Sequence, residues 1–277
     1  MVVVEEYIDL IFYRPLAFLL VKLVYNTGVT PDNLTFSAII SGLIAGILYA
    51  FGVQSTTIIA TCFFILFVIL DCSDGQLARL KKNGSATGRL LDGIADYLAV
   101  SAIYIGIAIG YSQKEGQPQY MLVLLALSAV SLIIQAMLVD FHRTRFLDIL
   151  NRHKNTFSEG IDDFKEEYHR LQNTKGKWLE KNIVYIYLVY SRLQRKLTAK
   201  RKINSLNVSP EEYFKKNRVL VRFWILMGPS AVRTTLIICS VLTRFDIYFW
   251  ITIAALNVYA ILLLIIQRIV DRSYSTH

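Results

Sequence analysis

Four aspartates lie at the junction between two strongly apolar segments of the chain: Asp71, Asp74, Asp92 and Asp96. Both flanking segments are apolar enough to be membrane-spanning helices, and a charged group inside a membrane is costly. Four unneutralised carboxylates at such a helix end would be strongly unfavourable, and a pair of divalent cations is the simplest partner for them. This feature limits the chain to folds in which helices pack around a shared polar site.

The composition agrees with a membrane protein. Of the 277 residues, 54% are hydrophobic, which is too many for an ordinary soluble protein of this length. The three cysteines, Cys62, Cys72 and Cys239, lie in apolar segments without paired spacing. They therefore indicate neither a disulfide framework nor a zinc site.

The apolar segments predict an all-α integral membrane protein with six transmembrane helices. Thr30 and Pro31 are a typical N-cap and first helical residue, and they mark the start of the first span. Residues 5–26 are apolar but interrupted by charges and a proline, which favours an amphipathic helix at the membrane interface over a spanning helix. The spans are expected at about residues 30–51, 56–71, 96–111, 119–140, 219–243 and 246–268.

Asp71 and Asp96 are expected at the same depth in the membrane. Fifteen uncharged residues precede Asp71 in the second span, and fifteen steps separate Asp96 from Tyr111 in the third. At about 1.5 Å per residue each run covers roughly 22 Å, so both acids lie just inside the same boundary. The two acid pairs therefore belong to neighbouring helices that a short loop joins.

The positive charges indicate which membrane face carries the acids. The net charge is +9, and residues 141–220 hold 18 of the 30 lysines and arginines. With six spans this region falls on the same side as Lys81, Lys82 and Arg268, which the positive-inside rule makes the cytoplasmic side. No nucleic-acid-binding motif accompanies the basic region, so we expect it to face anionic membrane lipids and expect no nucleic acid partner.

The basic region forms an insert between the fourth and fifth spans and is expected to be helical. Ser209 and Glu212 have the spacing of a capping box that leads into the fifth span. The apolar run at 183–190 is too short to cross a membrane, which favours a surface-lying helix. The chain is thus divided into an interfacial segment (1–29), spans one to four with the motif 71–96 (30–140), the insert (141–218), and the last two spans with the C-terminal tail (219–277).

The spacing of the acids fits a site for two metal ions. Residues three or four apart share a helix face, so Asp71 pairs with Asp74, and Asp92 pairs with Asp96. Hard cations prefer oxygen ligands, and no histidine or cysteine set competes, so Mg²⁺, Mn²⁺ or Ca²⁺ is favoured over Zn²⁺. Of these we expect two Mg²⁺ or Mn²⁺ ions. Metal ions beside an arginine, here Arg79, are typical of phosphoryl transfer.

The whole motif resembles the signature of the CDP-alcohol phosphotransferase (CDP-alcohol phosphatidyltransferase) family. The pattern D-x2-D-G-x2-A-R-x8-G-x3-D-x3-D is matched at every position by Asp71, Asp74, Gly75, Ala78, Arg79, Gly88, Asp92 and Asp96. The six-span layout and the leading segment around Thr30 to Thr35 are also similar to this family. The insert 141–218 lies outside its minimal pattern.

The resemblance implies both the reaction and the partners. The family transfers a substituted phosphate from a CDP-alcohol to a second alcohol and releases CMP, and its members are typically homodimers with the site at the cytoplasmic face. By position the resemblance implies that Asp71, Asp74, Asp92 and Asp96 bind the metal ions. Asp96 would also be, or lie beside, the general base that accepts the proton of the acceptor hydroxyl.

The CDP moiety would lie against small residues and an arginine. The resemblance implies that Gly75 and Ala78 border the cytidine and that Arg79 binds the diphosphate, while Gly88 allows the third span to approach closely. Asn33 and Thr35 have two readings, because they either touch the nucleotide or the metal site, or only cap the first span.

The acceptor pocket is expected to contain arginines. Arg222 and Arg233 are 11 residues apart, nearly three helical turns, so we expect them to share one face of the fifth span. An arginine within a span is a candidate for function, although Arg233 could instead pair with an acid such as Asp140 and Arg222 could snorkel. The end of the fourth span supplies further candidates, which could equally be cytoplasmic anchors: His142, Arg143 and Arg145.

These observations favour a multi-pass enzyme of phospholipid synthesis in a cell inner membrane. We expect CDP-diacylglycerol as the donor and a polar alcohol such as inositol phosphate or glycerol phosphate as the acceptor. The alternative is transfer from a CDP-headgroup to a lipid alcohol. A cation transporter is an alternative of another class, but Arg79 would repel a permeating cation, and the acids lie at one face rather than at the midplane.

Overall fold

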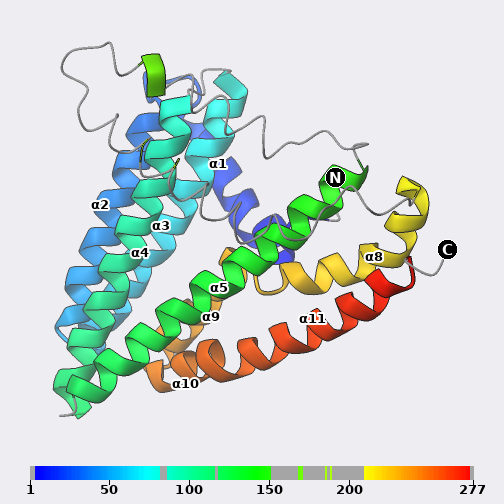
Figure 1. Ribbon diagram of the computed structural model, residues 1–277. Coiled ribbons are helices and arrows are strands. Elements are labelled where there is room, and N and C mark those ends of the chain that lie inside the picture. Colours follow the sequence, from blue (N-terminus) through cyan, green and yellow to red (C-terminus); the bar gives the residue numbers. More distant parts are fainter. Residues whose placement is uncertain are drawn as a thin grey trace.

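The computed structural model describes residues 4–81, 86–115, 118–150, 168–170, 185, 188 and 209–274, with the backbone alone for 86–96, 114, 115 and 118. Within this part of the chain the regular structure is helical and contains no strand. Figure 1 labels most of its elements. In chain order these are the π-helix η2 (Asp9–Tyr13), α1 (Arg14–Val24), α2 (Pro31–Ala50), α3 (Gln54–Lys81), α4 (Ala86–Glu115), α5 (Pro118–Leu150), α8 (Pro210–Ile225), α9 (Pro229–Val241), α10 (Phe245–Trp250), the π-helix η4 (Ile251–Ala255) and α11 (Leu256–Arg272).

The predicted all-α membrane architecture is confirmed. Five stretches among the described residues are long and apolar enough to cross a membrane: Pro31–Ala50, Gln54–Lys81, Gln119–Leu150, Pro210–Val241 and Phe245–Arg272. A shorter apolar stretch, Tyr97–Gln113, lies within α4. The count of six spans stays a prediction, because the side chains of the first turns of α4 lie outside the described residues.

Glycines let α2 and α4 approach each other closely. A Cβ atom at Gly46 would lie 2.6 Å from the backbone of Ala102, and one at Gly106 would overlap the carbonyl oxygen of Gly46. Small residues at helix crossings are the usual means of association in lipid, where burial of apolar surface gives little driving force between helices. Because α2 also packs along α3, these three helices form one unit, on the left in Figure 1.

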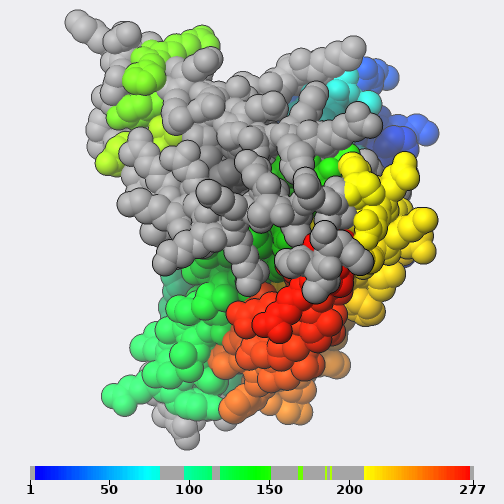
Figure 2. Space-filling model, turned by 45° about the vertical axis from the view of Figure 1, so that its right-hand side comes forward, coloured from blue at the N-terminus to red at the C-terminus, as the bar shows by residue number. Residues whose placement is uncertain are grey.

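A second unit consists of α5, α8 and α11, which contact one another. Figure 2 shows α5 (green) and α11 (red) side by side on one face of the molecule. Polar side chains join α5 to the last span: Gln135 donates to the carbonyl oxygen of Thr252 and to Asn257 Oδ1, both at 2.9 Å, and Ser128 bonds Thr252 at 2.8 Å. These bonds satisfy polar groups that would otherwise be costly at membrane depth.

The fifth span is broken in two. Residues 226–228 form a turn between α8 and α9, and α9 starts at Pro229 with Gly228 as its N-cap. Proline has no backbone N–H and disfavours a helical conformation in the residue before it, so a continuous helix is interrupted here. The expected single helix over 219–243, with Arg222 and Arg233 on one face, is therefore wrong.

The N-terminal segment is helical and two-sided. Its buried side chains follow each other at intervals of four residues at Tyr13, Ala17 and Val21, and Tyr13 and Val21 belong to the hydrophobic core. The opposite face is apolar yet exposed, at Ile11, Phe12, Phe18, Leu19 and Leu23. An exposed apolar face opposite a packed one is what an interfacial helix requires.

Candidate functional site

Asp71 and Asp74 lie one turn apart in the last three turns of α3. Asp74 is buried, with 4% of the residue exposed, and the Asp71 side chain is 21% exposed. The apolar part of α3 packs against α2 and fixes its rotation, so both carboxylates point toward neighbouring helices rather than lipid. The sequence prediction that these two acids share one helix face is consistent with this arrangement.

Arg233 of α9 forms an ion pair with Asp71. Its Nη1 donates to Asp71 Oδ2 at 3.0 Å, and its guanidinium lies 5.5 Å from the centre of the Phe67 ring. The Arg233 side chain is only 14% exposed, so the pair is largely shielded from solvent. The alternative partner considered from the sequence was Asp140; the structure gives Arg233 an acid of the motif itself.

Thr35 of α2 bonds the second acid. Its hydroxyl donates to Asp74 Oδ2 at 2.5 Å, a short distance typical of a hydroxyl on an ionised carboxylate. The N-cap of α2 is instead Thr30, whose side chain accepts from the N–H of Asn33 at 3.3 Å. Of the two sequence readings for Thr35, contact with the acidic site agrees with this geometry, whereas the Asn33 side chain is exposed.

Gly75 and Arg79 lie together on the last turns of α3. A Cβ atom at Gly75 would lie 3.9 Å from Nη2 of Arg79, so the guanidinium folds back over the glycine. Arg79 is exposed, and Ala78 is partly exposed beside it. This surface offers an accessible cation next to backbone that carries no bulky side chain, as a bound diphosphate requires.

The other half of the motif belongs to α4. Gly88, Asp92 and Asp96 fall within its first turns, but their side chains lie outside the described residues. Among the side chains that are described, no group of three or more His, Cys, Asp or Glu residues gathers as a metal site. The pair that is described, Asp71 and Asp74, offers carboxylate oxygens one turn apart, and this donor set fits a hard divalent cation such as Mg²⁺ or Mn²⁺.

The remaining acceptor candidates lie in different surroundings. Arg222 is exposed on α8, 5.9 Å from the centre of the Tyr7 ring. Arg143 is exposed on α5, whereas Arg145 is buried and bonds Asp271 of α11 at 2.7 Å. His142 stacks on the Trp224 ring, with 4.1 Å between centroids. The contacts of Arg145 and His142 join α5 to α11 and α8, so they serve helix packing.

The N-terminal segment supplies contacts that the sequence reasoning missed. Glu6 accepts hydrogen bonds from backbone N–H groups of α9, and Tyr13 bonds Thr234 of α9 at 2.8 Å. On α3, Gln76 donates to the carbonyl oxygen of Arg14 at 3.1 Å. Only the long-range packing of this segment reveals these roles, since a single acid or tyrosine in a surface helix carries no specific sequence signal.

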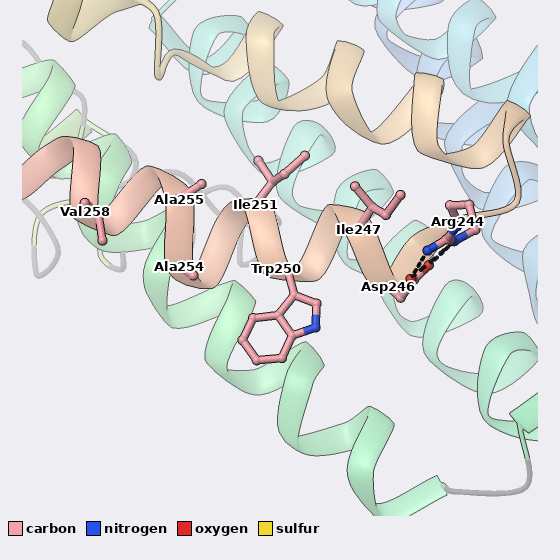
Figure 3. A pocket seen from close by; sticks show the side chains of 8 residues that line it. All are labelled: Arg244, Asp246, Ile247, Trp250, Ile251, Ala254, Ala255 and Val258. Atoms are coloured by element: carbon pink, nitrogen blue, oxygen red, sulfur yellow. Dashed lines mark hydrogen bonds and ion pairs between the residues drawn. The ribbon is translucent and has the colours of Figure 1, made fainter.

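A large open groove lies away from the motif. It has a volume of about 680 Å³ and follows α10, η4 and the start of α11, from Arg244 and Asp246 to Val258 (Figure 3). Arg244 pairs with Asp246 at 2.7 Å at one end, and the remaining lining is apolar. Its apolar walls are suited to lipid rather than to nucleotide chemistry.

Comparisons with known proteins agree with the motif. Residues 28–149 match the family model described as CDP-alcohol phosphatidyltransferase. A stretch of 84 residues is 33% identical to the "Cardiolipin synthase (CMP-forming) / mitochondrial hydrolase fusion protein" of Schizosaccharomyces pombe. It covers 30% of this chain and only 14% of that relative's length. No solved structure matches the chain. The family match includes both halves of the acidic motif, so residues 28–149 are similar to the CDP-alcohol phosphatidyltransferase family.

Proposed function

We propose that the protein transfers a phosphatidyl group from CDP-diacylglycerol to the hydroxyl of a polar acceptor, such as inositol phosphate or glycerol phosphate, and releases CMP. The observation that carries this proposal is the pairing of two motif acids with neighbouring helices, Asp71 with Arg233 and Asp74 with Thr35. The relative from S. pombe is named as CMP-forming, which supports the release of CMP. The match of residues 28–149 to the family model supports the CDP-alcohol donor.

The proposed site binds two divalent cations, Mg²⁺ or Mn²⁺, between α3 and α4. Asp71 and Asp74 would hold them from one helix, and Asp92 and Asp96 from the other. When bound, such cations neutralise the diphosphate and lower the pKa of the acceptor hydroxyl. The oxygen donors of the described pair support this choice of metal.

Different residues of the chain would then bind the donor and accept the proton of the acceptor. Arg79 binds the diphosphate, and Gly75 and Ala78 leave space for the cytidine. Asp96 accepts the proton of the acceptor hydroxyl as its oxygen attacks the β-phosphorus. A new oxygen–phosphorus bond forms, the bond to the bridging oxygen breaks, and that oxygen leaves with CMP.

Arg233 supports a phosphorylated acceptor. It brings a largely buried guanidinium next to a metal-binding acid, where the acceptor must approach. The alternative arrangement, a CDP-headgroup donor and a lipid alcohol acceptor, would not require a cation for the acceptor. We further propose that the site opens to the cytoplasmic face of a cell inner membrane and that the protein is a homodimer. For Arg143 and Arg222, a role at the acceptor stays a proposal.

The test is product analysis with purified protein. CDP-diacylglycerol is offered with a panel of polar acceptors and Mg²⁺ or Mn²⁺, CMP is quantified, and the lipid products are identified by mass spectrometry. We expect metal-dependent CMP release with one acceptor. Asp96→Asn should abolish turnover and leave binding of the CDP donor largely intact, and near-normal kcat in that variant would disprove the assignment of the base. Absence of CMP with every donor and acceptor pair would disprove the transferase.

A further inference from the structure

Glu6 holds the beginning of α9. Its Oε2 accepts hydrogen bonds from the backbone N–H groups of Ser230 at 2.8 Å and Ala231 at 3.2 Å. The carboxylate reaches them because residue 228 has no side chain, since a Cβ atom at Gly228 would lie 2.6 Å from Glu6 Oε2. The acid, the glycine and the two N–H groups thus form one closely fitted contact between distant parts of the chain.

This contact replaces a cap that α9 lacks. The first N–H groups of a helix have no acceptor within the helix, and the N-cap residue Gly228 has no side chain to supply one. The turn at 226–228 also separates α9 from α8, so α8 does not continue into α9 and fix its direction. A carboxyl group at this end satisfies the N–H groups and interacts favourably with the positive end of the helix dipole.

Arg233 lies on the next turn of the same helix. Ser230 and Ala231 are bonded by Glu6, Arg233 pairs with Asp71 at 3.0 Å, and Thr234 is bonded by Tyr13 at 2.8 Å. The N-terminal segment therefore forms hydrogen bonds with α9 both before and after Arg233. A rotation or shift of this turn would move the guanidinium relative to Asp71, and the N to O distance of 3.0 Å is already in the upper part of the hydrogen-bond range.

The same segment is fixed to α3, which carries Asp71. Gln76 donates to the carbonyl oxygen of Arg14, and Arg14 is itself held by Glu5 at 2.6 Å and by Asp9 at 2.7 Å. Both α3, which carries Asp71, and α9, which carries Arg233, thus bond to the same N-terminal segment. Glu5 differs from Glu6 in that its carboxylate accepts from Arg14 Nη1, within the N-terminal segment itself.

We propose that Glu6 is a positioning residue for the reaction, which sets the start of α9 so that Arg233 reaches Asp71. This rests on the proposed transferase function for its effect on turnover, but not for the contact itself. The N-terminal segment, whose outer face is apolar and exposed, thereby acts on the site through α9.

The contact is tested without activity by hydrogen–deuterium exchange of full-length protein. Glu6→Ala should speed exchange in a peptide that contains Ser230 and Ala231, because both N–H groups lose their acceptor. Glu5→Ala is the matched control, which removes an equal charge from the same segment and should leave exchange in this peptide unchanged. Unchanged exchange in Glu6→Ala would overturn the proposal, even if the wild type releases no CMP.

Measurement of kcat tests whether the contact of Glu6 with α9 affects the reaction. Glu6→Ala should lower kcat about tenfold, Glu6→Gln should restore part of it because the amide keeps a carbonyl acceptor, and Glu5→Ala should stay within about twofold of the wild type. Thermal unfolding of each variant separates this effect from loss of folded protein. If the wild type is active and Glu6→Ala keeps its kcat, the positioning role is wrong while the transferase stands.

A double variant separates positioning from general destabilisation. If Glu6 acts through Arg233, adding Glu6→Ala to Arg233→Lys should lower kcat by less than about twofold further. Multiplication of the two losses would overturn the proposal. If Arg233→Lys alone has no measurable turnover, the single variants and the exchange measurement decide.

Discussion

The guanidinium of Arg233 lies 3.0 Å from Asp71 Oδ2 and thereby joins α9 to the first acid of the motif. Both side chains are largely buried, so the ion pair lowers the cost of placing two charges away from solvent. Because α9 also contacts α3 directly, the pair joins the second half of the broken fifth span to the second span.

Removal of this arginine should affect turnover strongly. Arg233→Ala removes the guanidinium from Asp71, and loss of one partner of a buried pair destabilises the folded protein by about 3–5 kcal/mol. Because it also removes the cation proposed to meet the acceptor beside a metal-binding acid, we expect kcat/KM to fall at least about a hundredfold. Arg218→Ala is the matched control on α8, the adjoining helix, where the side chain is exposed. It should change kcat/KM by less than about threefold. Equal losses in both variants would contradict a special role for Arg233.

Thr35 should determine how well Asp74 binds metal. Thr35→Val removes the hydroxyl bond to Oδ2 while keeping the shape of the side chain, which costs about 1.5–3 kcal/mol for a bond to a charged group. We expect the Mn²⁺ concentration for half-maximal activity to rise, with Thr35→Ser close to wild type. Ser37→Ala serves as control, because the Ser37 hydroxyl donates to the carbonyl oxygen of Asn33 on the same helix. A Thr35→Val enzyme with unchanged Mn²⁺ dependence would refute this.

The close approach of α2 and α4 should not tolerate a methyl group. Gly106→Ala would force the new Cβ into the carbonyl oxygen of Gly46, and overpacking of this kind costs about 1–3 kcal/mol. The thermal unfolding midpoint in detergent should fall by several degrees. Gly28→Ala has open space around its Cβ, so it should leave the midpoint unchanged.

The stability of the protein should depend on the protonation of Glu6. Burial raises the pKa of Glu6 above its ordinary value of 4.5, and nearby Asp9 acts in the same direction, against the opposing effect of the N–H groups of Ala231 and Ser230. A raised folded-state pKa means that the folded state favours the protonated form. Its stabilising contribution is therefore fully present below pH 4.5 and is lost as pH rises through the raised pKa.

Glu6→Gln removes this titration and provides the comparison. The difference in unfolding midpoint, wild type minus variant, should be largest below pH 4.5 and shrink as pH rises through the raised pKa of Glu6. A difference that grows with pH would show that the pKa of Glu6 is depressed rather than raised.

The starts of helices could be predicted from the sequence wherever capping residues marked them. Thr30 and Pro31 predicted the start of α2, and the structure has this N-cap and first residue. Ser209 likewise caps α8 by accepting the N–H of Glu212. These signals depend on neighbouring backbone groups, so they need no knowledge of tertiary packing.

The sequence prediction failed where a long apolar pattern was followed and a local helix break within it was overlooked. The apolar content of residues 219–243 predicted one helix, although Gly228-Pro229 is a typical break, and the shared face of Arg222 and Arg233 failed with it. The partner of Arg233 could not be predicted, because spacing places a residue on its own helix but not against a distant one. The capping bonds of Glu6 on α9 were missed for the same reason. The spacing of Asp71 and Asp74 was informative because it was local.

The neutralisation of Asp71 has a consequence for where the family signature ends. The family match covers residues 28–149 and includes all four acids, whereas the guanidinium that balances Asp71 comes from residue 233. A fragment limited to the matched segment would keep every acid of the motif and lose the cation that shields one of them. The charges at this site are therefore not balanced within the matched segment alone. Transfer of the signature into another scaffold would bring the repelling carboxylates without the guanidinium of Arg233.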